Sequence, residues 1–200
     1  MKKLSTFILF VLLSGCSLFG SKPTAHTSIA VSIENQDRIR FSGKGAGAGM
    51  MMSASMGAMG IAIGVAIDEG IAKEIHESFV SSGGKFSAMI KAETNIWLAN
   101  VCHASQAVSE ALCQPNSDLS IKVYRYGFVT TSGDNDPVKA ELDIGFVLTE
   151  QPEFNLNLKG VDDAPQAPLE IIKKDGKVSS DLLTKSYQIL LESYANLLSK

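Results

Sequence analysis

Alternation of apolar and polar residues predicts strands in two parts of the chain. Near the N-terminus, residues 27–42 alternate on either side of a polar loop, which indicates a hairpin with one buried face. Residues 121–131 and 138–148 alternate more regularly, and the loop 132–137 between them is rich in turn-forming residues, so a second hairpin is expected there. Residues 154–158 add one more strand. The pattern therefore predicts an antiparallel sheet of about five strands.

The central segment, residues 43–80, has the pattern of a long helix that packs closely against another element. It carries no charge from Gly45 to Ile67, and about half of the residues in that run are Gly or Ala. Positions four apart lie on one helical face, so small residues at this spacing let a neighbouring backbone come close. The residues expected to form this packing face are Ala54, Ala58, Gly60, Ala62, Gly64 and Ala66.

Two further helices complete the predicted fold. Residues 86–112 follow helical spacing, and the chain closes with an amphipathic helix from about Asp181, with Ser179 or Ser180 as its N-cap. Residues 161–168 are assigned to an acidic loop. Since no second domain boundary is visible, we predict a single α+β domain over residues 27–200, with the helices on one face of the sheet.

Cys102 and Cys113 test the extent of the helix predicted over residues 86–112. In one unbroken helix their Cα atoms would lie about 16 Å apart, whereas a disulfide needs them within about 7 Å. Either the helix breaks between the two cysteines or the thiols are not paired with each other. We favour a disulfide with a helix break.

The first fifteen residues have the layout of a secretory signal. Two lysines precede the apolar run 4–13, and small residues come directly before Cys16. The sequence Leu13-Ser14-Gly15-Cys16 resembles the lipobox of bacterial lipoproteins, and an ordinary signal peptide or a short membrane helix is the alternative. The resemblance implies that residues 1–15 are removed, that Cys16 is acylated, and that residues 16–26 form a tether.

The residue after the lipidated cysteine favours one membrane. In the enterobacterial pattern an Asp at this position retains a lipoprotein in the inner membrane, but here Ser17 follows Cys16. We therefore expect anchoring in the outer membrane, facing the periplasm, with the outer-membrane lipid leaflet as a partner. Such an oxidising compartment also permits the disulfide.

The segment 43–80 resembles the glycine-zipper segments of some bacterial envelope proteins. Its uncharged run is long enough to span a bilayer, but only four of its residues are strongly apolar, so spanning by a monomer is marginal. Burial within the domain is the preferred interpretation. Self-association and membrane insertion are the alternatives.

Composition and motifs give little support to other chemistry. The formal net charge is −3 without a basic cluster, which argues against nucleic acid as a partner. Residues 43–48 satisfy a dinucleotide fingerprint, but the acidic residue required after a second strand is missing. Met52, Met56 and Met59 would share a helical face, and their thioethers suit weak Cu(I) binding. Methionine more commonly fills apolar gaps, and that is the preferred interpretation. We predict no metal, no cofactor and no catalytic residues.

These observations favour a non-enzymatic, lipid-anchored periplasmic protein. It would serve as an accessory or structural subunit of a cell-envelope assembly or transport system, through an envelope protein partner or through self-association. One alternative is a membrane-active protein that inserts or oligomerises through the glycine-zipper helix. A periplasmic hydrolase is the other, although the sequence shows no nucleophile elbow.

Overall fold

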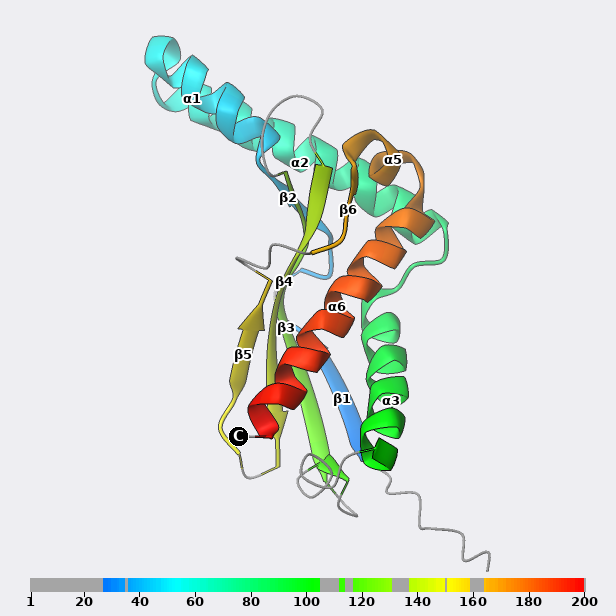
Figure 1. Cartoon of the computed structure of the whole chain (residues 1–200). Helices are drawn as coiled ribbons and strands as arrows, with labels where there is room; N and C mark the ends of the chain where they lie inside the picture. Colours follow the sequence, from blue (N-terminus) through cyan, green and yellow to red (C-terminus); the bar gives the residue numbers. More distant parts are fainter. Residues whose placement is uncertain are drawn as a thin grey trace, which may run out of the picture.

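A six-stranded, mostly antiparallel sheet with helices packed against it forms the mixed α/β fold of the computed structural model (Figure 1). The strands are β1 (Ser28–Ile33), β2 (Arg40–Ser42), β3 (Asp118–Thr130), β4 (Pro137–Leu148), β5 (Phe154–Asn157) and β6 (Gln166–Pro168). The helices are α1 (Lys44–Met56), α2 (Ala58–Ser81), α3 (Phe86–Ala104), α5 (Leu169–Lys174) and α6 (Gly176–Leu198).

The structure describes residues 27–34, 36–104, 112–113, 117–130, 137–149, 151–158 and 164–199. The predicted signal peptide, residues 1–15, and the predicted tether, residues 16–26, lie outside these ranges. The acylation predicted for Cys16 therefore stays a prediction.

The centre of the sheet agrees with the prediction. β3 and β4 pair antiparallel from Leu119 opposite Leu148 to Thr130 opposite Val138, which is the long hairpin expected from the alternation. β5 pairs antiparallel with the other edge of β4. β6, within the segment assigned to a loop, also pairs with β4.

The N-terminal hairpin prediction is wrong. β1 and β2 do not pair with each other; both run parallel to β3, with Ile33 opposite Val123 and Arg40 opposite Gly127. The connection thus contains more residues than the stretch of β3 it passes, and it bulges outward without reversing direction. Its attachment to β3 is direct, because the hydroxyl of Tyr126 donates to the Asp37 carboxylate at 2.6 Å.

The hydrophobic core lies between one face of the sheet and helices α3 and α6 (Figure 1). Alternate residues of β3 and β4 point into it, as a two-residue period requires. From α6, the ring of Tyr194 stacks on Phe146 with centroids 4.5 Å apart, and Tyr187 lies beyond it at 6.4 Å. The residues of the two central strands in this core are Leu119, Ile121, Val123, Tyr126, Phe128, Val138, Ala140, Leu142, Ile144, Phe146 and Leu148.

Helix α6 begins at Gly176, five residues before the predicted start. Its N-cap is Asp175, whose carboxylate accepts from the backbone N–H of Lys177 at 2.9 Å, and not one of the predicted serines. Ser179 is buried inside the helix and donates its hydroxyl to the carbonyl of Ile172. Asp175 is thus the single residue between α5 and α6.

Helix α3 ends at Ala104, between the two cysteines considered above. In the structure Cys102 and Cys113 are joined by a disulfide, with their Cα atoms 5.8 Å apart. This end of the fold also holds Thr27, whose hydroxyl donates to the carbonyl of Leu112 at 2.7 Å. The disulfide therefore lies close to the point where the chain enters the sheet.

Two buried tyrosines of α6 allow a matched test of the core. Thr94 donates to the carbonyl of Ile90, so the hydroxyl of Tyr187 donates to Thr94 at 2.7 Å. The buried hydroxyl of Tyr194 has no hydrogen-bond partner among the described residues. Burial also raises the pKa of Tyr194 to about 12.

We expect Tyr187→Phe to lower the free energy of unfolding by about 1 kcal/mol, because one buried hydrogen bond is lost. Tyr194→Phe removes a hydroxyl without such a partner and should leave stability unchanged or raise it. Urea denaturation of the two variants beside the wild type measures the difference. Equal losses in both variants would contradict the hydrogen-bond assignment.

Candidate functional site

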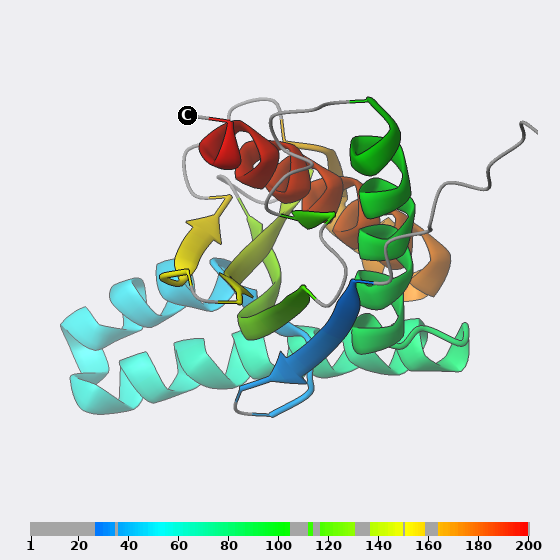
Figure 2. The same cartoon turned by 90° about the horizontal axis from the view of Figure 1, so that it is seen from below.

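The segment predicted as one long helix forms a helical hairpin. α1 ends at Met56, Gly57 turns the chain with φ of 57°, and α2 begins at Ala58 and returns alongside α1 (Figure 2). A positive φ is readily adopted only by glycine. The prediction of an unbroken helix over residues 43–80 is therefore wrong, because Gly57 reverses the chain inside the uncharged run.

The two helices touch through glycines. Gly45 and Gly49 of α1 face Gly60 and Gly64 of α2, and all four are buried. A Cβ placed on Gly45 would lie 1.7 Å from the carbonyl oxygen of Gly64, and one on Gly60 would lie 2.4 Å from backbone atoms of Met52 and Ser53. Only glycine allows the two backbones to pack this closely.

The predicted packing face is only partly the observed one. Gly60 and Gly64 lie in the contact, whereas Ala54, Ala58, Ala62 and Ala66 are exposed. Because α1 folds back onto α2, the face of α2 that contacts α1 is the face that carries Gly60 and Gly64. The partner glycines Gly45 and Gly49 were missed, although they show the same four-residue spacing in the sequence.

Asp68 closes the base of the hairpin. Its carboxylate accepts from the backbone N–H of Gly43 at 3.1 Å and from that of Gly45 at 2.7 Å. These N–H groups belong to the N-terminus of α1, where a negative charge is favourable. In a dinucleotide site this position would hold a phosphate; here a side chain of the protein occupies it, which argues against nucleotide binding.

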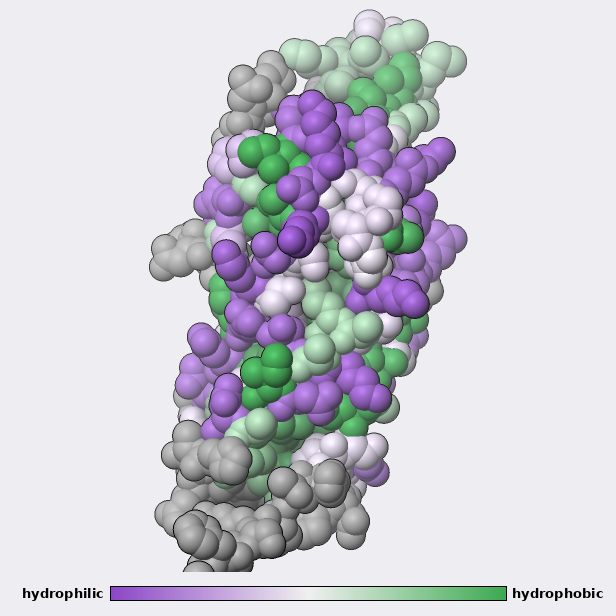
Figure 3. Space-filling view, turned by 90° about the vertical axis from the view of Figure 1, so that its right-hand side faces the viewer, coloured by the Kyte–Doolittle hydropathy of each residue, from purple (hydrophilic) through white to green (hydrophobic). Residues whose placement is uncertain are grey.

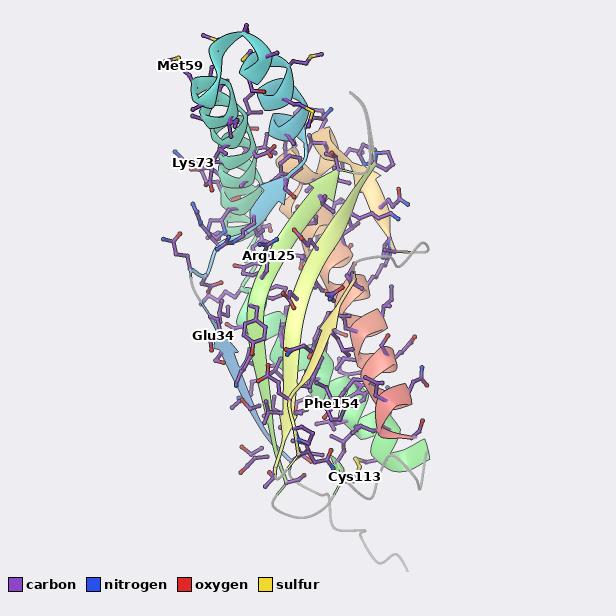
Figure 4. The ribbon with its side chains drawn as sticks, turned by 90° about the vertical axis from the view of Figure 1, so that its left-hand side faces the viewer. Glu34, Met59, Lys73, Cys113, Arg125 and Phe154 are labelled. Atoms are coloured by element: carbon purple, nitrogen blue, oxygen red, sulfur yellow. A yellow bond between two sulfur atoms is a disulfide. The ribbon has the colours of Figure 1, made fainter. Side chains whose placement is uncertain are left out.

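The surface of the hairpin is apolar and exposed. Met51 of α1 is 79% exposed, and Met59 at the start of α2 is 62% exposed. Between Gly45 and Ile67 the other exposed large apolar residues are Met50, Met52, Met56, Ile61, Val65 and Ile67. Hydrophobic colours gather at this end of the molecule, above a surface that is mainly hydrophilic (Figure 3). In Figure 4 Met59 lies at the tip, and the charged Lys73 lies nearer the body.

Neither a membrane span nor a metal site of the usual ligands is found in the described part of the chain. None of the described helices has the length and apolar character needed to cross a bilayer. Within the same residues, no three His, Cys, Asp or Glu side chains gather where they could hold an ion. Met59 is separated from Met52 and Met56 by the turn, so the single helical face considered for Cu(I) is absent.

The hairpin lies at one end of the sheet, and the start of β1, where the described chain enters the sheet, lies at the other. β1 begins with Ser28 beside Asp118, at the start of β3. β2 ends with Ser42 beside Val129, at the other end of β3, and α1 follows after one residue. At about 3.3 Å per residue, the 13 residues of β3 separate these ends by about 40 Å. The start of β1 is therefore far from the hairpin.

Two depressions lie near the base of the hairpin. The larger, of about 620 Å³, is an apolar groove between the hairpin and α5, and Ile67, Ile71 and Leu169 contribute to its lining. At its rim Lys173 pairs with Glu74 at 2.8 Å, and this contact raises the pKa of Lys173. The smaller, of about 180 Å³, is lined by both charged and apolar side chains and includes Arg38, which pairs with Glu69 at 2.9 Å.

The face of the sheet away from α3 and α6 carries a polar network (Figure 4). The Tyr124 hydroxyl donates to one oxygen of Glu153, and Lys122 lies 3.0 Å from the other. The hydrogen bond from Tyr124, followed by that from Lys122, lowers the pKa of the Glu153 carboxyl. These groups satisfy one another, which is typical of a structural network.

Comparison with known proteins adds no family: no family model, curated protein or solved structure matches the chain. The candidate site is therefore argued from geometry alone. Of the features described here, the projecting apolar hairpin is the one that its own fold leaves without a covering element.

The glycine contact can be tested with two substitutions in α2. Gly64→Ala places a Cβ 2.3 Å from the carbonyl oxygen of Gly45, so α1 must move away, and we expect a loss of about 1–3 kcal/mol in the stability of the hairpin. This loss of stability should appear as faster hydrogen exchange of the α1 backbone amides.

Gly70→Ala is the matched control, because a Cβ there meets no atom within 4 Å. Alanine in a helix interior is favoured over glycine by about 0.5–1 kcal/mol, so this variant should be slightly stabilised. Equal protection of α1 in both variants would show that the glycines are not a close-packed contact.

The Glu153 network predicts a pH dependence. Because the pKa of Glu153 is lower in the folded protein than its ordinary value of 4.5, its stabilising effect is present above pH 4.5 and is lost as the pH falls through the folded pKa. Glu153→Gln should weaken this acid dependence in pH-dependent urea denaturation. An unchanged profile below pH 4.5 would contradict the role of the network.

Proposed function

We propose that the chain is a non-enzymatic lipoprotein of the bacterial cell envelope. It is held in the outer membrane through Cys16, faces the periplasm, and serves as an accessory or structural subunit of an envelope assembly or transport system. Its contact with a further envelope component is made by the hairpin of α1 and α2.

The observation that carries this proposal is the exposed apolar surface of the hairpin, at the end of the sheet opposite Thr27. Soluble proteins rarely expose large contiguous apolar patches, and such patches commonly mark interaction sites. A lipid on Cys16 would be joined to the fold through Thr27, and the hairpin offers a second attachment at the other end of the sheet. A protein with two attachments of this kind is suited to connecting parts of an envelope.

A membrane-active protein is the second candidate. It is favoured by the uncharged run from Gly45 to Ile67, which leaves the part of the hairpin around the Gly57 turn without a charged side chain. For this second candidate, the hairpin contacts lipid instead of another protein. The proposed anchoring in the outer membrane through Cys16 is unchanged.

The anchor is tested by Cys16→Ser in a bacterial host that acylates lipoproteins. The wild type should incorporate a fatty-acid probe and sediment with the outer membrane in a density gradient, and the variant should do neither, because the acylated thiol is missing. A variant with Cys102→Ser and Cys113→Ser together is the control, since it retains Cys16 and should label as the wild type does. Continued labelling of Cys16→Ser would remove the basis of the proposed location.

A further inference from the structure

We propose that the tip of the hairpin, from Gly45 through Gly57 to Ile67, inserts into the hydrocarbon of one leaflet of a lipid bilayer and stops there. The inference deepens the proposed function, and rests on it for the envelope location, because it names lipid as what the hairpin contacts. The tip is thus a shallow membrane-inserting element and not a spanning one.

The distribution of apolar side chains favours lipid as the occupant. Because glycines fill the contact between α1 and α2, the larger side chains of the tip lie on the outside, including Met51, Ile61 and Val65. A second copy or another protein docked on one side would leave the outer face of the other helix exposed. Hydrocarbon surrounds the hairpin and covers all of these faces together.

Polar groups of the tip are bonded within the hairpin. Ser53 donates its hydroxyl to the carbonyl of Met50 at 2.8 Å, and Ser55 donates to that of Met52 at 3.2 Å. At the turn, the N–H of Gly57 donates to Ser53 and that of Gly60 donates to Gly57. Hydrocarbon offers no hydrogen-bond partner, so these internal bonds lower the cost of placing the tip in lipid.

The length of the hairpin sets the depth of insertion. α1 has 13 residues, about 20 Å at 1.5 Å per residue, and its one charged residue is Lys44 at the base. One leaflet supplies about 15 Å of hydrocarbon, half of the bilayer core. At the base, Asp68 is bonded to Gly45 and Glu69 is paired with Arg38. These charged groups would stop insertion at the headgroups, since burying them is costly.

The test uses a tryptophan as a local reporter in the full, acylated chain. In a Trp97→Phe background, which removes the single native tryptophan, Met51→Trp places the reporter on α1 and Ile96→Trp places it on the body. Ile96 is a matched position because it is also an exposed apolar residue on a helix, at 56% exposure. Both proteins are reconstituted in vesicles of equimolar phosphatidylethanolamine and phosphatidylglycerol with brominated acyl chains.

We expect the Met51→Trp emission to shift to shorter wavelength and to be quenched by mid-chain bromine at least about twofold more than that of Ile96→Trp, because only the hairpin enters the hydrocarbon. Adding Ile61→Lys to Met51→Trp should abolish the excess quenching, since a charge then lies on the tip. Thermal unfolding of each variant shows that the fold is retained.

Equal quenching of the two reporters would overturn the inference, and so would unchanged quenching after Ile61→Lys. In the Cys16→Ser chain, which lacks acyl groups, a blue-shifted Met51→Trp emission in detergent-free buffer together with a dimer in sedimentation would also overturn it, because a second copy would then cover the tip. In each of these cases acylation of Cys16 still reports on the proposed location independently.

Discussion

The backbone contact between α1 and α2 determines the shape of the most distinctive part of the molecule. Gly45 and Gly49 have no side chain to interpose, so the two helices approach until their backbones meet. The larger side chains between Gly45 and Ile67 therefore have no interior to fill and remain largely outside. Asp68 fixes the register at the base by bonding the first N–H groups of α1. One steric constraint thus sets the close pairing, the narrow hairpin and its apolar surface.

Much of the sheet could be predicted, because alternation reports which residues share a face. It identified β3, β4 and β5, but it does not report the direction of a partner strand. The segment 27–42 therefore looked like a hairpin, although both of its strands follow β3 in parallel. The prediction of one unbroken helix over residues 43–80 was wrong for a related reason. Gly57 resembles the other glycines of the run in sequence, and only its positive φ identifies it as the turn.

The candidate site was predictable where spacing alone decides the geometry. Gly60 and Gly64 were recognised by their four-residue separation, and distance along a helix required that α3 end between Cys102 and Cys113 if the two are bonded. The four alanines were assigned to packing because a helix considered alone gives no means of choosing among its faces. The cap supplied by Asp68 depends on the hairpin, so no local pattern around Gly45 could reveal it.

The parallel course of β1 and β2 along β3 has a mechanical consequence. A force pulling the chain entry away from the hairpin would act along the strand direction and load the hydrogen bonds between β1 and β3 in shear. Bonds loaded in shear must break together, whereas those of a strand peeled from its end break one at a time. Because β1 and β2 are both paired with β3, the connection between them would extend only after one of these pairings has broken. The parallel pairing of this edge therefore resists separation of the two ends of the sheet.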